Sequence, residues 1–268
     1  MQVTFLSESF PARVASARLR YTLIWPHLEA MGLKRGKDLL VMQKHGWDWS
    51  MTEGYRRKIA DICDNHFGDS KGDHYRRMCR EADLIVCNSD EMKHVIELET
   101  GKTAIVIPDP YESREREPHV NEHLLWFGHK SNLEDLWRIM PDIQDFPSLT
   151  VVSNAPMTFQ WSPELMDGMF QLCGISLLPT GKSLCKSANR VLESLRNGLF
   201  VVAEDLPAYR EFSGFIHIGG NIRAGIEWAL GNPEAANDMT REGQHYIRER
   251  YSPKTIAEQW HRALTLLD

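Results

Sequence analysis

Short apolar runs alternate with longer segments of helical periodicity along almost the whole chain. Most of these runs are apolar at successive positions rather than at alternate ones, as in strands whose two faces are both buried in a parallel sheet. The strands predicted in this way are Val3–Leu6, Asp38–Met42, Lys58–Cys63, Leu84–Cys87, Ala104–Ile107, Leu124–Phe127, Leu149–Val152, Ile175–Leu178, Leu199–Ala203 and Phe215–Ile218.

Helices are predicted between these strands. In the first, Ala15–Met31, the leucines recur at helical spacing and Gly32 follows as a stop signal. The others are His74–Ala82, Asp90–Glu99, Asn132–Met140, Ser187–Arg196 and a helical tail broken near Pro233 and Pro253. Strands that alternate with helices indicate βαβ units, so the pattern predicts an α/β protein with parallel sheets.

A charged, proline-flanked segment divides the chain into two sets of such units. Residues 111–122 show no apolar period, and we interpret them as a linker. The prediction is therefore two Rossmann-like domains, residues 1–110 and 123–252, that face each other across a cleft. Ligands of open α/β sheets bind at the carboxyl ends of the strands, so the cleft is the expected site.

Composition and charge exclude several classes of protein. The 268 residues are 42% hydrophobic and 25% charged, which is ordinary for a globular protein. A net charge of −6 argues against a surface that binds nucleic-acid backbone. Five scattered cysteines without a C-x-x-C pair argue against a disulfide framework or a zinc knuckle. Without a membrane-length apolar run or a secretory signal pattern, we expect a soluble, cytoplasmic protein.

The strongest candidate for chemistry is the segment Lys182–Gly198, which runs into Leu199–Pro207. The N–H groups at the start of its predicted helix, beside the small residues Ser187, Ala188 and Asn189, suit a diphosphate. Lys182, Lys186 and Arg190 add positive charge, and Glu193 could accept hydrogen bonds from both ribose hydroxyls. An ordinary amphipathic helix with a solvated lysine pair is the alternative.

Two other nucleotide motifs fail. Pro179–Ser183 has the Gly-Lys-Ser ending of a P-loop, but Ser176 stands where its first glycine is required. No G-x-G-x-x-G follows any predicted strand, so a simple NAD site has no support.

The stretch from Lys182 to Arg210 resembles the donor-binding segment of GT-B glycosyltransferases, specifically the retaining family 4. The matching positions are Gly198, Val201–Ala203, Asp205, Pro207 and Arg210–Glu211. Glu193 falls on the second glutamate of the family's motif, which holds the nucleotide ribose, whereas the first glutamate falls on Cys185.

Weaker matches extend this resemblance over the whole chain. Arg18, after the first strand, falls where the family approaches the donor phosphates, and Ile107–Asp109 resembles the strand end before the linker. Gly128 and Lys130 resemble the first turn of the C-terminal domain, with Lys130 at the place of a basic phosphate ligand. The tail resembles the last helix of the fold, so we expect helix 253–268 to cross back to the N-terminal domain.

The resemblance implies a compact, hexosyltransferase-like glycosyltransferase with an N-terminal acceptor domain and a C-terminal nucleotide-sugar domain. The donor would be a UDP-sugar, by family frequency. Its diphosphate would lie on Ser187, Ala188 and Asn189, with the leaving group neutralised by Lys130, Lys186 and Arg190. This scheme requires neither a metal nor a cofactor besides the donor substrate. A glycan, a lipid-linked sugar, a small molecule or a modified nucleic-acid base all remain candidate acceptors.

The segment Asp61–Phe67 is a candidate catalytic group at the end of a strand. Asp64 and His66 would face the acceptor or the donor sugar, and an imidazole suits proton transfer at neutral pH. Helix capping by Asp64 and a surface histidine are the alternative. A metal site built from Asp61, Asp64, His66, Asp69, Asp73 and His74 matches no defined ligand spacing.

Three further segments have open interpretations. Lys44 and His45 could contact an acceptor or a phosphate and Trp47 or Trp49 could stack on a sugar, unless this is a solvated loop. The basic runs Tyr55–Lys58 and Tyr75–Arg80 suggest either anionic lipid or nucleic acid, or the wet face of a helix. Asn154–Met157 and Trp161 could frame the nucleotide base.

Two other functions remain open. Cys185 at the position of the first glutamate motivates a GT-B-shaped nucleotide-binding protein that has lost transfer activity. An epimerase of the same two-domain shape would bind a similar nucleotide but give a different product.

Overall fold

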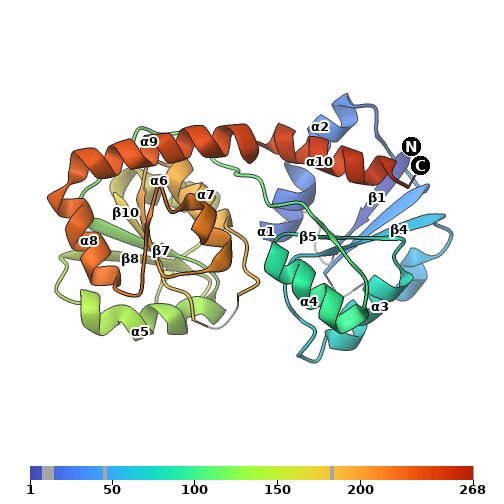
Figure 1. The fold of residues 1–268 in the computed structure, drawn as a ribbon, viewed down its shortest axis with the longest axis horizontal. Coiled ribbons are helices and arrows are strands. Elements are labelled where there is room, and N and C mark those ends of the chain that lie inside the picture. The colour runs from blue at the N-terminus through green and yellow to red at the C-terminus, as the bar shows by residue number, and fades with distance from the viewer. Residues whose placement is uncertain (8–14, 45–46, 182–183, 268) are drawn as a thin grey trace. The chain divides into compact units, whose positions relative to one another are not determined.

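A computed structural model of the chain describes residues 1–7, 15–44, 47–181 and 184–267. The chain forms two compact units, each built on a six-stranded parallel sheet with helices packed against it (Figure 1). Unit 1 comprises Met1–Glu112, Cys185–Ser187 and Arg250–Asp268, and unit 2 comprises Ser113–Leu184 and Ala188–Glu249. The predicted α/β class with two Rossmann-like sheets is confirmed.

The sheet of unit 1 has the strand order β2-β1-β3-β4-β5-β6, with every pair parallel. The strands are β1 (Gln2–Leu6), β2 (Lys34–Arg35), β3 (Leu39–Gln43), β4 (Arg57–Ile62), β5 (Leu84–Cys87) and β6 (Ile105–Val106). All five residues of β3 are buried, which explains why its sequence is apolar without alternation.

Helices cover both faces of this sheet. Helices α3 (Gly72–Glu81) and α4 (Asp90–Thr100) pack on one face, through Met78 and Ile96 among others. Helices α2 (Trp25–Ala30) and α10 (Pro253–Thr265) pack on the other, where Trp260 is fully buried. The C-terminal helix therefore completes the core of the N-terminal unit, as predicted.

The single helix predicted over Ala15–Met31 is wrong. The chain forms a short helix α1 (Ala15–Ala17), a π-helical turn η1 (Arg18–Thr22) and then α2. Pro26, in the first turn of α2, has no N–H to continue the preceding hydrogen-bond ladder. The π-helical turn carries Arg20, whose side chain is buried rather than solvated.

The sheet of unit 2 has the order β12-β11-β10-β7-β8-β9 and is also parallel. Its strands are β7 (His123–Phe127), β8 (Ser148–Ser153), β9 (Phe159–Gln160), β10 (Ile175–Leu178), β11 (Phe200–Ala203) and β12 (His217–Ile218). Its helices are α5 (Leu133–Ile143), α6 (Pro163–Leu172), α7 (Asn189–Arg196), α8 (Ile222–Gly231) and α9 (Pro233–Arg250). Helices α5 and α8 share one core cluster with the sheet, whereas α6 packs in another. The sequence patterns did not predict α6, β2 or β9.

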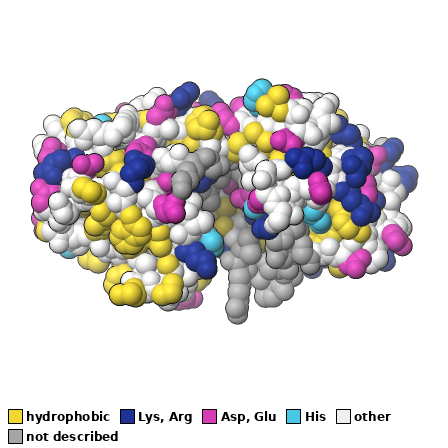
Figure 2. Space-filling model, turned by 90° about the horizontal axis from the view of Figure 1, so that it is seen from below, with side chains coloured by type: hydrophobic (Ala, Val, Ile, Leu, Met, Phe, Trp, Pro, Cys, Tyr) yellow, Lys and Arg dark blue, Asp and Glu magenta, His cyan; other side chains and the backbone are white. Residues whose placement is uncertain are grey.

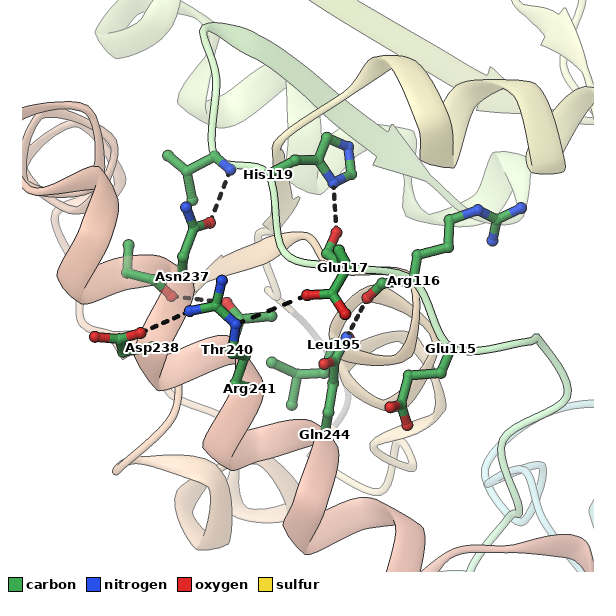
Figure 3. Close-up of polar contacts among 12 residues, drawn as sticks. Glu115, Arg116, Glu117, His119, Leu195, Asn237, Asp238, Thr240, Arg241 and Gln244 are labelled. Atoms are coloured by element: carbon green, nitrogen blue, oxygen red, sulfur yellow. Dashed lines mark hydrogen bonds and ion pairs between the residues drawn. The ribbon is translucent and has the colours of Figure 1, made fainter.

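Residues 113–121 form neither helix nor strand, but they are held on unit 2 by polar contacts (Figure 3). The Arg116 carbonyl accepts a hydrogen bond of 2.7 Å from Nε2 of Gln244, on α9. The Val120 N–H donates to Oδ1 of Asn237 at 2.9 Å, and the Arg116 guanidinium contacts Asn197 and Asp167. Charge and polarity rather than an apolar period therefore hold this segment in place.

The surface carries charge of both signs. On unit 1, Lys and Arg side chains lie among Asp and Glu, and Figure 2 also shows apolar side chains gathered on the α5 face of unit 2. Trp137 of α5 is 53% exposed. None of the helices in the described ranges combines the length and the hydropathy that crossing a bilayer requires.

Candidate functional site

The candidate donor site lies at the carboxyl ends of the unit 2 strands. Gly128 follows β7, and Lys130 begins a short 3-10 turn, η3 (Lys130–Asn132). The Lys130 N–H donates a 2.8 Å hydrogen bond to Oδ1 of Asn154, which follows β8. Neighbouring parallel strands end at the same edge of a sheet, so these residues share one edge with the loop that leaves β10.

Arg190, in the first turn of α7, is buried at this edge. It is only 9% exposed, and among the described residues its Nη1 atom has no hydrogen-bond partner. A Cβ atom added at Gly128 would lie 3.6 Å from Nη1 and 3.3 Å from the Trp126 ring, so Gly128 lies beside the guanidinium. A buried cationic group without its full set of partners is costly, which makes this edge the candidate place for an anion.

The backbone at the start of α7 adds donors to the same place. The helix begins at Asn189, so the prediction that Ser187 and Ala188 lie in its first turn is wrong. Ala188 is the N-cap residue, and it has no side chain that could accept the first N–H groups of the helix. Ala188 thus leaves these N–H groups without a side-chain cap, which is the arrangement that favours an anionic ligand.

Glu193 lies one turn after Arg190 on the same face of α7 and is also only 9% exposed. The next residue, Ser194, donates a hydrogen bond of 2.8 Å from its hydroxyl to the Ser176 hydroxyl. Both side chains are fully buried, so this bond fixes α7 on β10. The Asn197 side chain donates to the Glu193 carbonyl at 2.7 Å. The helix that carries Arg190 and Glu193 is therefore anchored on the sheet independently of any ligand.

Glu204, the residue after β11, contacts the loop between β10 and α7. Its carboxylate accepts the Thr180 N–H at 2.7 Å and pairs with the Arg138 guanidinium of α5, also at 2.7 Å. The hydrogen bond to Glu204 raises the pKa of Arg138. Lys182, which the sequence placed in this loop, lies outside the described residues.

The remaining candidate residues, Arg18, Asp64, His66, Lys186 and Ser187, belong to unit 1. The Arg18 guanidinium forms a bidentate pair with Glu112, with an Nη2–Oε1 distance of 2.7 Å. That these residues meet the donor residues of unit 2 in one site stays a prediction.

Asp64 is ion-paired with Lys44, the residue after β3. Burial acts to raise the pKa of Asp64, but the Lys44 charge outweighs it and the pKa is lowered. A carboxylate held in this way is a weak proton acceptor. His66 places Nδ1 2.7 Å from Oδ2 of Asp69, which orients the imidazole.

Cys185 does not replace the missing glutamate chemically. Its side chain is 7% exposed and packs in the unit 1 core cluster that also contains Phe67 and Met92. Burial raises the pKa of its thiol, so the group is neutral at physiological pH.

A buried ion network in unit 1 was missed by the sequence analysis. The Arg20 guanidinium contacts both carboxylate oxygens of Asp61 at 2.9 Å and Oδ1 of Asp109 at 3.0 Å. It also donates to the Ile107 carbonyl at 2.8 Å. Burial alone would lower the pKa of Arg20, but the two carboxylates raise it. A lone arginine in a helical pattern gives no signal of such a network.

The tryptophans proposed to stack on a sugar are packed instead. The rings of Trp47 and Trp49 lie 4.9 Å apart, and the His74 ring is 4.8 Å and 5.1 Å from them. Arg77 lies 3.9 Å above the Trp49 ring. Trp47 is buried, so the stacking interpretation has no open ring face there. His45 lies outside the described residues.

The basic runs of unit 1 are matched by acids. Arg76 pairs with Glu99 at 2.7 Å, and Arg77 and Lys58 both pair with Glu81. This favours the solvated-surface interpretation over a lipid or nucleic-acid site. In the described ranges, no group of three or more His, Cys, Asp or Glu side chains is arranged to hold a metal ion.

Comparison with known proteins places the fold. Neither the family models nor the curated protein sequences that were searched give a match. Among solved structures, HepE of Anabaena in complex with UDP-glucose superposes with a TM-score of 0.66 at 14% identity, over 85% of this chain and 78% of HepE. The lipopolysaccharide outer core galactosyltransferase WaaB gives 0.60 at 10% identity, over 99% of both chains.

The S. aureus protein TarM, in a complex that contains UDP, gives a TM-score of 0.58 at 12% identity. The match covers 86% of this chain but only 55% of TarM, so the chain spans little more than half of that length. The class is therefore defined at the level of fold: the chain has the GT-B fold of glycosyltransferases, as the motif resemblance predicted.

Proposed function

We propose that this protein is a glycosyltransferase that takes a sugar from a UDP-sugar donor. The observation that carries the proposal is the buried Arg190 guanidinium at the strand ends of unit 2, beside Gly128 and the start of α7, where its Nη1 atom has no hydrogen-bond partner among the described residues. The structural neighbours HepE with UDP-glucose and TarM with UDP support a uridine nucleotide.

In this proposal the donor diphosphate lies against Arg190 and the first N–H groups of α7, with Lys130 at the neighbouring strand end. Glu193 accepts hydrogen bonds from the ribose hydroxyls. As the bond from the anomeric carbon to the phosphate oxygen breaks, negative charge grows on UDP, and these fixed donors stabilise it without moving. Lys186 adds a further cation to the leaving group, so the scheme needs no metal.

The acceptor hydroxyl must lose its proton as it attacks. We assign this step to His66, because Asp69 orients its ring and an imidazole nitrogen can accept a proton. Asp64 is ion-paired with Lys44, so we do not assign the proton transfer to it.

The test is calorimetric titration of the whole chain with UDP and UDP-glucose. Arg190→Met should weaken UDP binding at least about tenfold, as expected for the loss of a charge-assisted contact. The same variant should be as stable as the parent to urea, or more stable, because it removes a buried charge whose Nη1 atom has no hydrogen-bond partner among the described residues. Arg223→Met is the matched control, since Arg223 pairs with Asp145 on the surface of unit 2.

Unchanged UDP binding by Arg190→Met would contradict the assignment of the site. Loss of UDP binding in both arginine variants would also contradict it, because the effect would not be specific to Arg190.

One observation favours a second function, a nucleotide-binding protein of GT-B fold without transfer activity. Cys185 occupies the position of the first glutamate, and its thiol is buried and neutral. UDP binding without release of UDP from UDP-sugars, over a panel of donors and acceptors, would favour this second function. UDP release that depends on an acceptor would exclude it.

A further inference from the structure

Lys44, in unit 1, has an unusual backbone conformation. It follows β3 with φ 64°, in the left-handed region, where a side chain with a Cβ costs about 1 kcal/mol or more. Its carbonyl accepts a 3.2 Å hydrogen bond from Nε2 of His74, whose ring packs against Trp47 and Trp49. The surrounding structure thus holds a strained residue at the carboxyl edge of the sheet, where such strain commonly serves a ligand.

The Lys44 ammonium is largely covered, and Asp64 is its described counter-ion. The Lys44 side chain is 14% exposed, whereas the Asp64 side chain is 48% exposed. Asp61, the nearest deeper carboxylate, is already paired with Arg20 and accepts a hydrogen bond from Gln43. An incoming anion could therefore reach Lys44 by displacing Asp64, which is the outer member of the pair.

The groups around Asp64 show which anion would fit in its place. Burial acts to raise the pKa of Asp64, but Lys44, His66 and Lys71 act together to lower it. Of these three groups Lys44 contacts Asp64 directly, so its ammonium would also face an anion that replaced the carboxylate, and the charges of His66 and Lys71 would act in the same direction. Two lysines and an imidazole match a phosphate dianion better than a neutral hydroxyl or a single carboxylate.

We infer that Lys44 binds a phosphate group on the acceptor, and that Asp64 is the counter-ion which this phosphate displaces. The role as an acceptor site rests on the proposed glycosyltransferase function, whereas phosphate binding at Lys44 does not. The inference narrows the acceptor to a phosphorylated compound.

The experiment titrates the whole chain with inorganic phosphate, in saturating UDP so that the candidate donor site of unit 2 is filled. Lys44→Met should weaken phosphate binding at least about tenfold. Asp64→Asn should tighten it about threefold or more, because the phosphate no longer competes with a carboxylate. Lys58→Met is the matched control, since Lys58 is also a unit 1 lysine paired with a carboxylate, Glu81, at 3.3 Å.

Phosphate binding by Lys44→Met equal to that of the parent would overturn the inference, and so would unchanged or weaker binding by Asp64→Asn. The gain expected for Asp64→Asn cannot come from misfolding, so it protects the test if Lys44→Met proves unstable. Glycerol 3-phosphate should bind at least as tightly as free phosphate if an acceptor is recognised, and its exclusion would contradict the acceptor role.

The two proposals fail separately. If UDP does not bind, phosphate is titrated into the Arg190→Met variant, in which the candidate donor site is disabled. Phosphate affinity that still depends on Lys44 would support this inference. If UDP binds through Arg190 but phosphate binding ignores Lys44 and Asp64, only this inference fails.

Discussion

Two buried arginines, one in each unit, differ in how their charge is compensated. Arg20 is fully buried but lies against Asp61 and Asp109, so its charge is compensated inside the protein. Arg190 is nearly as buried, yet among the described residues its Nη1 atom has no partner. Because an uncompensated charge destabilises the fold, the position of the second arginine agrees with the proposed anion site better than with a structural role.

The buried hydroxyl pair behind α7 gives a prediction at this scale. Ser194→Ala should lower the free energy of unfolding by about 1–3 kcal/mol, because it leaves the buried Ser176 hydroxyl without its partner. The double variant Ser176→Ala with Ser194→Ala should lose less than the single variant, because both polar groups are then gone. Urea unfolding of the two single variants and the double variant measures this difference. A double variant that loses the sum of the two single losses would show that the hydroxyls do not depend on each other.

At the scale of elements, two helices end in the same way but in different surroundings. Gly198 follows α7 with φ 76°, and Gly101 follows α4 with φ 67°. A Cβ at Gly198 would lie 2.4 Å from the Glu117 carbonyl oxygen, whereas a Cβ at Gly101 would have nothing within 4 Å. The left-handed conformation is common to both positions, so only the crowding differs.

Gly101→Ala should therefore cost about 1 kcal/mol of stability, the strain of a left-handed alanine. Gly198→Ala should cost about 2–4 kcal/mol, because the segment that carries Glu117 must also move. Chemical unfolding of both variants, compared with the parent, checks the difference. Equal losses would mean that the backbone of residues 116–117 can move away from the new Cβ without a loss of stability. That would be contrary to the contacts of Arg116 with Gln244 and Asn197.

Elements of continuous apolar sequence could be predicted, whereas contacts distant in sequence could not. The interior strands β5 and β10 coincide with predicted runs, because burial on both faces requires apolar residues at successive positions. Arg20 could not be placed, since its partners Asp61 and Asp109 are 41 and 89 positions away. The sequence could not show that Nη1 of Arg190 lacks a hydrogen-bond partner among the described residues. It did place Arg190 at the start of the helix that follows a strand, and the structure has it there.

For the whole molecule, the units have separate cores but not separate chain segments. The last helix, α10, belongs to the core of unit 1 although all of unit 2 precedes it in sequence. The core of unit 1 therefore cannot be complete until α10 is present, whereas the core clusters that the described residues of unit 2 form include no residue of α10. Damage to α10 should consequently act on the candidate acceptor unit and leave the candidate nucleotide unit intact.

Trp260→Ala tests this division. Trp260 is fully buried on α10, with its ring 5.9 Å from that of Phe5 and below the Arg20 guanidinium at 5.3 Å. The variant should destabilise unit 1 by about 3–5 kcal/mol, as for other buried aromatic truncations. Amide hydrogen exchange should accelerate in β3 and β4 but not in β10 and β11, and UDP affinity should be retained. Trp137→Ala is the control, since this exposed ring should change neither. Equal acceleration in both sheets would contradict this division and would mean that the two units unfold as one.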